Sequence, residues 1–240
     1  MFREFLKTAA LEFEIDLTNS QLDLFDKFYS MVLDWNSRIN LTNLTEPRDF
    51  ALKNVIDSLS AWRAIEKSFP NKNISVIDVG SGAGFPGVPL KILHPEIKLT
   101  SIDSLGKRVK FLDAVRIELQ LDEFTCIQAR AEDLGRLENY REKFDVAISR
   151  AVAKLPILLE LCIPLVKVNG IFVAMKGKKF LEELGESRKA VEDLGGEFLE
   201  TIEIKLPELD DTRALITSKK IRQTSKKFPR QFGIIEKKPL

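Results

Sequence analysis

Apolar residues in the first seventy positions recur at helical spacing. Thr18 to Ser20 offers a helix N-cap, and another helix is predicted from Thr45-Glu46-Pro47, where a proline in the first turn costs no hydrogen bond. Between these two starts, the apolar positions with three- and four-residue spacing are Leu22, Phe25, Phe28, Tyr29, Val32 and Trp35. Residues 1–72 are therefore predicted to form an N-terminal helical segment whose apolar stripe packs on the rest of the protein.

The pattern changes after the polar linker at residues 70–73. Short apolar runs predict strands at 74–79, 99–103, 124–128, 144–149 and 171–176. The segments between them have helical patterns at 88–93, 107–119, 156–167 and 180–194. Strands that alternate with helices indicate a mostly parallel sheet that is covered on both faces.

Two further strand-like runs, 198–205 and 213–221, are joined by the short turn at 207–211 and predict an antiparallel hairpin. Residues 73–221 are therefore expected to form one α/β domain of Rossmann-like type, with a seven-stranded sheet that ends in this hairpin.

Charge is distributed unevenly along the chain of 240 residues. Lysine and arginine number 37 against 36 aspartate and glutamate residues, so the net charge is only +1. Residues 219–240 nevertheless carry eight basic residues and a single acidic one. A basic tail, taken here as residues 222–240, is typical of a polyanion partner, although a merely solvated terminus gives the same pattern.

Several classes of protein are excluded or disfavoured by composition. The two cysteines, Cys126 and Cys162, cannot form a disulfide framework, and the N-terminus has no apolar signal core. The most apolar stretch, 155–175, is interrupted by charged residues, proline and glycine, so no membrane anchor is expected. One histidine and two separated cysteines also offer no metal site. We expect a cytoplasmic protein.

The first predicted strand runs into a glycine-rich loop that extends to Gly87. Gly82, Gly84 and Gly87 satisfy the dinucleotide fingerprint, whereas Gly80, Gly82 and Gly84 with Asp78 upstream give a pattern suited to S-adenosylmethionine. In the second interpretation, the Asp78 carboxylate is expected to meet the amino group of the cofactor. In both interpretations, an acidic residue should end the second strand and bind the ribose, and Asp103 stands there.

The residues after Asp103 favour methyl transfer over hydride transfer. Hydride transfer to a carbonyl usually needs a proton donor, yet His94 is the only histidine. The fourth strand ends in the run 148–153, which has neither the Asn/Asp-Pro-Pro-aromatic run of adenine amino methylases nor the cysteine of cytosine C5 methylases. It offers a cation, Arg150. A strand end with a cation and no general base suits a methyl acceptor that already has a free lone pair, such as guanine N7. This acceptor loses no proton, so the protein needs only to position it in line in a dry pocket.

Motifs along nearly the whole chain resemble one bacterial family. They are Asn40-Leu41-Thr42-Asn43-Leu44-Thr45, the pair Asp57-Ser58, and the segments 79–90, 103–112, 148–151, 176–177 and 229–240. The double-proline glycine loop and Ser-Leu-Gly-Lys-Arg are the most distinctive. The chain is thereby identified as similar to the small-subunit ribosomal RNA methyltransferase G family, also called glucose-inhibited division protein B. The resemblance implies a class I methyltransferase that transfers a methyl group from S-adenosylmethionine to N7 of a guanine in 16S rRNA.

The resemblance also assigns site residues. It implies that Gly80 and Phe85 line the cofactor, that Ala131-Glu132 meets the adenine, and that Arg150 lies at the methyl-donor edge as the catalytic residue. With the residues taken from the loop pattern, the expected cofactor set is Asp78, Gly80, Gly82, Gly84, Phe85, Asp103, Ala131, Glu132 and Arg150. Two positions depart from the family, since Asn54 replaces a common histidine and Phe228 a common tyrosine.

Basic residues beside the predicted cofactor edge and in the tail suggest an RNA-facing rim. The expected RNA-binding residues are Lys107, Arg108, Lys176, Lys178, Lys226, Lys227, Phe228 and Arg230. For the lysines, a solvated surface position is an equally good interpretation. Phe228 and Phe232 could stack on bases or could anchor the tail on the fold. The expected partner is 16S rRNA or the small ribosomal subunit, and the expected state is a monomer.

Overall fold

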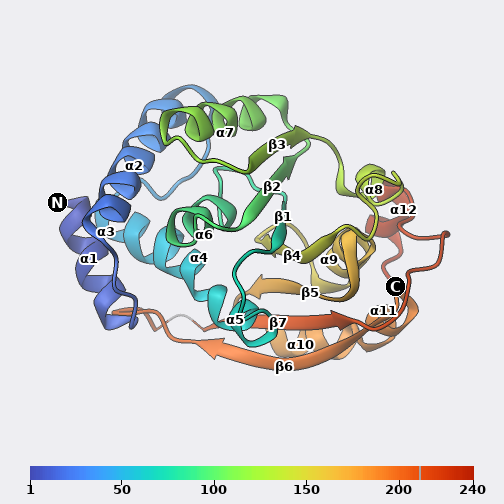
Figure 1. Cartoon of the computed structure of the whole chain (residues 1–240). Coiled ribbons are helices and arrows are strands. Elements are labelled where there is room, and N and C mark those ends of the chain that lie inside the picture. Colours follow the sequence, from blue (N-terminus) through green and yellow to red (C-terminus); the bar gives the residue numbers. More distant parts are fainter. Residues whose placement is uncertain (211) are drawn as a thin grey trace.

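A seven-stranded sheet crosses the middle of the protein in a computed structural model, which describes every residue except Asp211 (Figure 1). The strands are β1 (Ser75–Val79), β2 (Lys98–Asp103), β3 (Phe124–Gln128), β4 (Phe144–Arg150), β5 (Val166–Lys176), β6 (Gly196–Ile204) and β7 (Arg213–Lys220). They lie in the order β3-β2-β1-β4-β5-β7-β6. The first five strands are parallel, and β7 pairs antiparallel with both β5 and β6.

The α/β class and the mostly parallel sheet with a C-terminal antiparallel hairpin are thus confirmed. The strand β7 lies between β5 and β6, so β6 forms the edge of the sheet. One residue of the predicted turn between these strands, Asp211, lies outside the described residues.

Helices cover both faces of the sheet. Those before β1 are α1 (Phe2–Glu12), α2 (Asn19–Ile39), α3 (Pro47–Asp49), the π-helical segment η1 (Phe50–Ile56), α4 (Asp57–Ser60) and α5 (Trp62–Ser68). Those after β1 are α6 (Gly87–Leu93), α7 (Gly106–Glu118), α8 (Ala131–Leu134), α9 (Leu155–Cys162), the 3₁₀ turn η2 (Ile163–Leu165), α10 (Phe180–Glu186), α11 (Arg188–Asp193) and α12 (Phe232–Lys237).

Alternate residues of the strands point into two separate apolar cores. Val76 of β1 packs with the N-terminal helices, α6 and α7, whereas its neighbour Ile77 packs with α8 to α12. The N-terminal helices and the C-terminal helix α12 therefore lie on opposite faces of the sheet, and Figure 1 shows them at opposite ends of the view. The central strands β1 and β4 are buried along most of their length, as expected for strands with helices on both faces of the sheet.

The helix predicted after Thr18 is confirmed together with its cap. The Gln21 backbone N–H donates to Thr18 Oγ1 at 3.2 Å, and the Gln21 side-chain oxygen accepts from the Thr18 N–H at 3.0 Å. This reciprocal capping box satisfies two donors that a helix start leaves unpaired. The helix predicted from Pro47 also exists, and it continues through η1 and α4 to α5 with little interruption.

Two of the predicted helices differ from their patterns, since one ends early and the other is interrupted. The helix predicted at 156–167 stops at Cys162 and passes through η2 into β5, because Pro164 has no N–H with which to continue the helix. The helix predicted at 180–194 is broken at Ser187 into α10 and α11. Among the described residues, no helix is both long and apolar enough to cross a bilayer.

Candidate active site

Three neighbouring strands bring the candidate residues to one edge of the sheet. The glycine loop follows β1, Asp103 ends β2 and Arg150 ends β4, and these strands are adjacent in the order β2-β1-β4. From β1 the chain adds β2 and β3 on one side of the sheet and then β4 and β5 on the other, so the strand order switches between β1 and β4. Ligands of open α/β folds bind at the carboxyl ends of the strands beside such a switch point.

The glycine loop is held close to β2 and β4 by its backbone. The N–H groups of Gly80 and Ser81 donate to the Ile102 carbonyl at 2.9 and 3.0 Å. Gly80 has a φ of +76°, and a Cβ added there would lie 2.5 Å from Val152 Cγ2. Only glycine therefore fits this position, because a side chain would meet both backbone strain and the wall formed by Val152.

Asp78 lies beneath the glycine loop, and it does not line the cofactor cavity described below. Its side chain is fully buried, and its Oδ2 accepts a hydrogen bond from the Gly87 N–H at 3.0 Å. The contact expected between this carboxyl and a cofactor amino group therefore stays a prediction, because the structure encloses Asp78 and does not place it in the cavity lining. The carboxyl instead shapes the turn into α6, because it is enclosed by the loop that it supports.

The cofactor cavity has a volume of about 390 Å³ and lies over the loop. Asp103, Arg108, Phe85 and Arg150 line it together with Gly80 and Gly82. Gly84 is not part of the cavity lining and packs closely against Val88, because a Cβ added to Gly84 would lie 2.8 Å from the Val88 side chain. The residues that line the cavity are Leu41, Thr42, Asn54, Gly80, Ser81, Gly82, Ala83, Phe85, Asp103, Ser104, Arg108, Arg150, Ala151 and Val152.

Asp103 offers a carboxylate at the floor of this cavity. Its Oδ2 accepts from the Gly82 N–H at 3.0 Å and forms an ion pair with Arg108 at 3.3 Å. Its Oδ1 accepts from the Leu105 N–H at 2.9 Å. These bonds fix the direction of the carboxylate at the end of β2, where the sequence predicted an acceptor for ribose hydroxyls.

A smaller cavity of about 160 Å³ continues from the first and shares Gly80, Asp103, Ser104 and Val152 with it. The predicted adenine residues, Ala131 and Glu132, line this second cavity. Burial raises the pKa of Glu132 from its usual range. The structure also places Phe232 of α12 in its wall. The sequence analysis did not place this residue at the cofactor, because nothing local connects position 232 with β3 and α8.

Arg150 stands between the cofactor cavity and a third cavity. Its guanidinium donates to the Lys53 carbonyl at 2.8 Å, to Asp57 Oδ2 at 2.9 Å and to Asn54 Oδ1 at 3.0 Å. It also lies 5.0 Å from the centre of the Phe85 ring. Arg213 pairs with the other oxygen of Asp57 at 3.3 Å. Arg150 thus ties the end of β4 to η1, α4 and the glycine loop.

The third cavity, called here the acceptor cavity, has a volume of about 610 Å³ and a strongly basic lining. It shares Thr42, Asn54, Arg150 and Ala151 with the cofactor cavity, so the two meet at Arg150. The charged residues that line it are Lys53, Asp57, Arg150, Lys176, Lys178, Lys179, Glu183 and Arg213. Both of its carboxylates are paired with cations, Asp57 with the two arginines and Glu183 with Lys176 at 2.7 Å.

The eight predicted RNA-binding residues fall into three groups. Lys107, Lys178, Lys226 and Lys227 are exposed. Arg108 and Lys176 instead face the cofactor and acceptor cavities, where each is ion-paired.

Phe228 and Arg230 belong to the interior of the fold. The Phe228 side chain is only 4% exposed and packs in the core under α9, and Arg230 forms an ion pair at 2.6 Å with the fully buried Glu160. The interpretation that Phe228 anchors the tail is therefore the one that the structure favours. Stacking of its ring on RNA does not fit this burial.

The only histidine and the two cysteines lie away from these cavities. His94 packs against Trp62, and burial lowers its pKa to about 4. Cys126 and Cys162 are free thiols, and neither lines one of the three cavities. Within the described part of the chain, no cluster of three or more histidine, cysteine, aspartate or glutamate side chains could hold a metal ion.

Solved structures share this fold. A TYW2 protein of M. jannaschii in complex with AdoMet matches with a TM-score of 0.53 at 17% identity, over 69% of this chain and 77% of that one. A variant of the 16S rRNA (adenine(1408)-N(1))-methyltransferase from Catenulisporales acidiphilia also matches with a TM-score of 0.53, at 12% identity, over 68% of this chain and 92% of that one. These matches show that the chain shares the Rossmann-like fold of these structures.

The sequence comparison is more specific. The family model of GidB, rRNA small subunit methyltransferase G, matches residues 21–216. The ribosomal RNA small subunit methyltransferase G of Desulforamulus reducens is 46% identical over 98% of this chain and 97% of its own length. The protein of the same name from Alkaliphilus oremlandii is 44% identical over 99% and 98%. The chain belongs to the rRNA small subunit methyltransferase G family, as its motifs predicted.

The buried Asp78 carboxyl should make the unfolding free energy of the protein decrease as the pH rises. Burial raises the pKa of its carboxyl to about 7, so the folded protein holds a proton that the unfolded chain releases above about pH 4. Stability should therefore fall as pH rises from about 4 to 7. In Asp78→Asn this loss is absent, and the unfolding free energy of the variant relative to the original protein should increase with pH, by at most about 1.4 kcal/mol per pH unit. Urea unfolding at pH 5, 6, 7 and 8 measures it, and a difference that is constant with pH would contradict the assignment.

Proposed function

We propose that this protein transfers the methyl group of S-adenosylmethionine to N7 of a guanine in the 16S rRNA of the small ribosomal subunit. The observation that carries the proposal is the position of Arg150 at the junction of a nucleotide-type cavity and a large basic cavity. Methyl transfer requires the donor and the acceptor to meet in line, and this junction is where ligands in the two cavities would meet. The names of the full-length relatives support the same substrate class.

The residues that line the two cofactor cavities fit S-adenosylmethionine part by part. Asp103 would accept hydrogen bonds from the ribose hydroxyls, and the narrow cavity beside Ala131 and Glu132 would take the adenine. The Gly80–Gly84 loop and Phe85 would border the methionine part. When bound, the cofactor supplies an electrophilic methyl group on a sulfonium.

The acceptor cavity fits a nucleotide that has been turned out of its RNA. Its volume of about 610 Å³ exceeds that of the cofactor cavity, and lysines and arginines dominate its charged lining. Enzymes that modify a base commonly flip it into such a pocket. Guanine presents the acceptor O6 beside N7 on the same edge, so an arginine or lysine donor that binds O6 would hold the base and leave the N7 lone pair free to react.

This site can perform the reaction without a general base. Guanine N7 attacks with its lone pair, so no proton must leave before the new bond forms. Both carboxylates of the acceptor cavity are held as ion pairs, and no histidine, cysteine or tyrosine of the described chain lines it. Asp57 pairs with both Arg150 and Arg213, so it offsets part of the positive charge that the two guanidinium groups would place near a sulfonium.

The exposed lysines extend the basic character of the acceptor cavity to the surface. Lys178 lines the cavity rim, and Lys107, Lys226 and Lys227 are exposed elsewhere on the protein. We assign these four lysines to phosphate contacts. Because one chain forms all three cavities, the protein is expected to act as a monomer, and a ribosomal substrate would place it in the cytoplasm.

The function is tested with labelled S-adenosylmethionine and small ribosomal subunits that lack the modification. One labelled guanine in 16S rRNA, identified as N7-methylguanine by its base-labile ring and strand scission, is the expected result. Label at another base would retain the methyltransferase and reject the acceptor atom. Cofactor binding without transfer to subunits or to naked rRNA would reject the proposal in favour of a cofactor sensor.

Arg150 and Asp103 should have separable roles in that assay. Arg150→Ala is expected to lower kcat about 100-fold with a small change in cofactor affinity, because the residue aligns the acceptor with the bound cofactor at the junction. Asp103→Ala should do the reverse and weaken cofactor binding about 10- to 100-fold, since it removes charge-assisted hydrogen bonds to the ribose. Titration calorimetry and single-turnover transfer measure the two effects. Arg188→Ala, at an exposed position on α11, is the control, and equal losses in both quantities for both variants would contradict these roles.

RNA binding should depend steeply on salt and on the exposed lysines of the tail. The double variant Lys226→Ala/Lys227→Ala is expected to lower the slope of log affinity against log salt by about 1 to 2, because each lost phosphate contact removes close to one unit. Filter binding to 16S rRNA at salt concentrations from about 50 to about 300 mM measures this slope. The matched control is Lys7→Ala/Lys27→Ala, two exposed lysines on α1 and α2 at the other end of the molecule (Figure 1). An unchanged slope in the tail variant would reject these contacts.

A further inference from the structure

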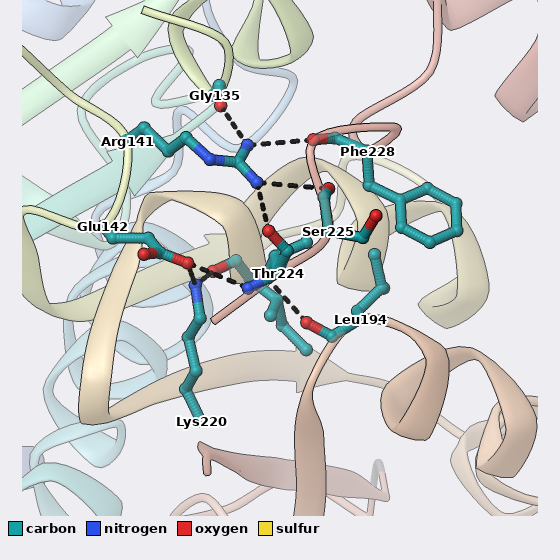
Figure 2. Close-up of polar contacts among 9 residues, drawn as sticks. Gly135, Arg141, Glu142, Leu194, Lys220, Thr224, Ser225 and Phe228 are labelled. Carbon is teal, nitrogen blue, oxygen red and sulfur yellow. Dashed lines mark hydrogen bonds and ion pairs between the residues drawn. The ribbon is translucent and has the colours of Figure 1, made fainter. Parts of the chain in front are cut away.

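The C-terminal segment, residues 222–240, is fastened to the body of the protein by Arg141 (Figure 2). One guanidinium nitrogen donates to the carbonyls of Gly135 at 2.7 Å and Phe228 at 2.9 Å. The other donates to the carbonyls of Thr224 at 2.6 Å and Ser225 at 3.2 Å. A fixed cation that satisfies four carbonyls at once defines the path of this segment closely.

Two further contacts hold the same segment. Glu142 Oε1 accepts from the Thr224 N–H at 2.9 Å and from the buried Lys220 ammonium at 2.7 Å, as Figure 2 shows. Farther along, Glu160 accepts from the backbone and the guanidinium of Arg230. Since Glu160 is completely buried, this ion pair is costly to break. The segment is therefore part of the fold, although its composition is that of a basic arm.

The fastened segment packs directly against α8, which carries the predicted adenine residues. A Cβ added to Gly135, at the C-terminal end of α8, would lie 3.0 Å from the Pro229 ring. Arg141 bridges the same two places, because one nitrogen binds both the Gly135 and the Phe228 carbonyls. The position of α8, and with it that of Ala131 and Glu132, is thus coupled to the position of the C-terminal segment.

Beyond these anchors, the segment enters α12 at Phe232, whose half-buried ring lines the small cavity at the adenine end of the cofactor site. The Arg130 guanidinium lies 5.8 Å from the centre of this ring. The rest of the cavity wall includes Ala131, Leu161 and Val152, which are apolar. A purine ring is planar and apolar on its faces, so it suits a narrow cavity of this lining.

We propose that the C-terminal segment forms the outer wall of the adenine site and that Phe232 contacts the adenine of the cofactor. The proposal rests on the proposed use of S-adenosylmethionine. It assigns the aromatic residues of the tail to the fold and to the cofactor, with Phe228 as anchor and Phe232 as the contact. The exposed Lys226 and Lys227 between the anchors remain available for RNA.

The test is Phe232→Ala in the full-length protein, with titration calorimetry for S-adenosylmethionine, S-adenosylhomocysteine and adenosine. Loss of one aromatic contact with a base should weaken binding of all three about tenfold. Phe232→Tyr, which keeps the ring, should retain most of the affinity, and Phe232→Leu should lie between. The matched control is Ile234→Ala. Ile234 is on the same helix, is exposed and lines none of the three cavities, so this variant should bind the three ligands normally.

Further readouts separate this proposal from a general structural effect and from failure of the proposed function. At saturating cofactor, kcat and rRNA affinity of Phe232→Ala should stay within about twofold, because only the adenine contact is lost. Cofactor affinity that is unchanged in Phe232→Ala, or reduced equally in Ile234→Ala, would overturn the adenine contact. A loss of rRNA affinity with normal cofactor affinity would assign the ring to RNA instead. If the unaltered protein bound none of the three ligands, the proposed cofactor itself would be wrong.

Discussion

The hydrogen bonds of Arg150 join parts of the protein that are distant in sequence but must meet for the site to exist. Arg150 ends β4, its partner Asp57 lies 93 positions earlier at the start of α4, and its guanidinium covers Phe85 of the glycine loop. The wall shared by the cofactor and acceptor cavities is built from these contacts. The apolar core packs the N-terminal helices on the sheet, and these polar contacts fix Asn54 and Asp57 beside the end of β4.

The two faces of the sheet contribute to different parts of the site. The N-terminal helices, which share a core with α6 and α7, supply Asn54 and Asp57 at the junction with the acceptor cavity. The helices of the other face supply part of the smaller cavity, through Ala131 and Glu132 of α8 and Phe232 of α12. The sheet between them holds the two parts of the site at a fixed separation, because its central strands β1 and β4 are buried and pair with a neighbour on both sides.

The basic tail illustrates how little composition says about the use of a charge. Arg230 of the tail and Lys220 at the end of β7 are two of the eight basic residues counted in 219–240. Arg230 forms an ion pair with Glu160, and Lys220 forms one with Glu142. Only residues such as Lys226 and Lys227 remain exposed. The excess of positive charge in the last residues of the chain therefore serves two purposes, namely to dock a segment onto an acidic body and to present a basic surface.

The local amino-acid sequence alone determined the alternation of helices and strands, the glycine loop and the acidic end of β2. These features depend on periodicity, capping and backbone conformation, which neighbouring residues control. The partners of the polar side chains were decided only by the tertiary structure. The Asp78 carboxyl accepts a hydrogen bond from Gly87 beneath the loop, Phe228 is buried in the core, and Phe232 lines the smaller cavity. Such contacts join residues far apart in sequence, and no local pattern records which surfaces the folded sheet brings together.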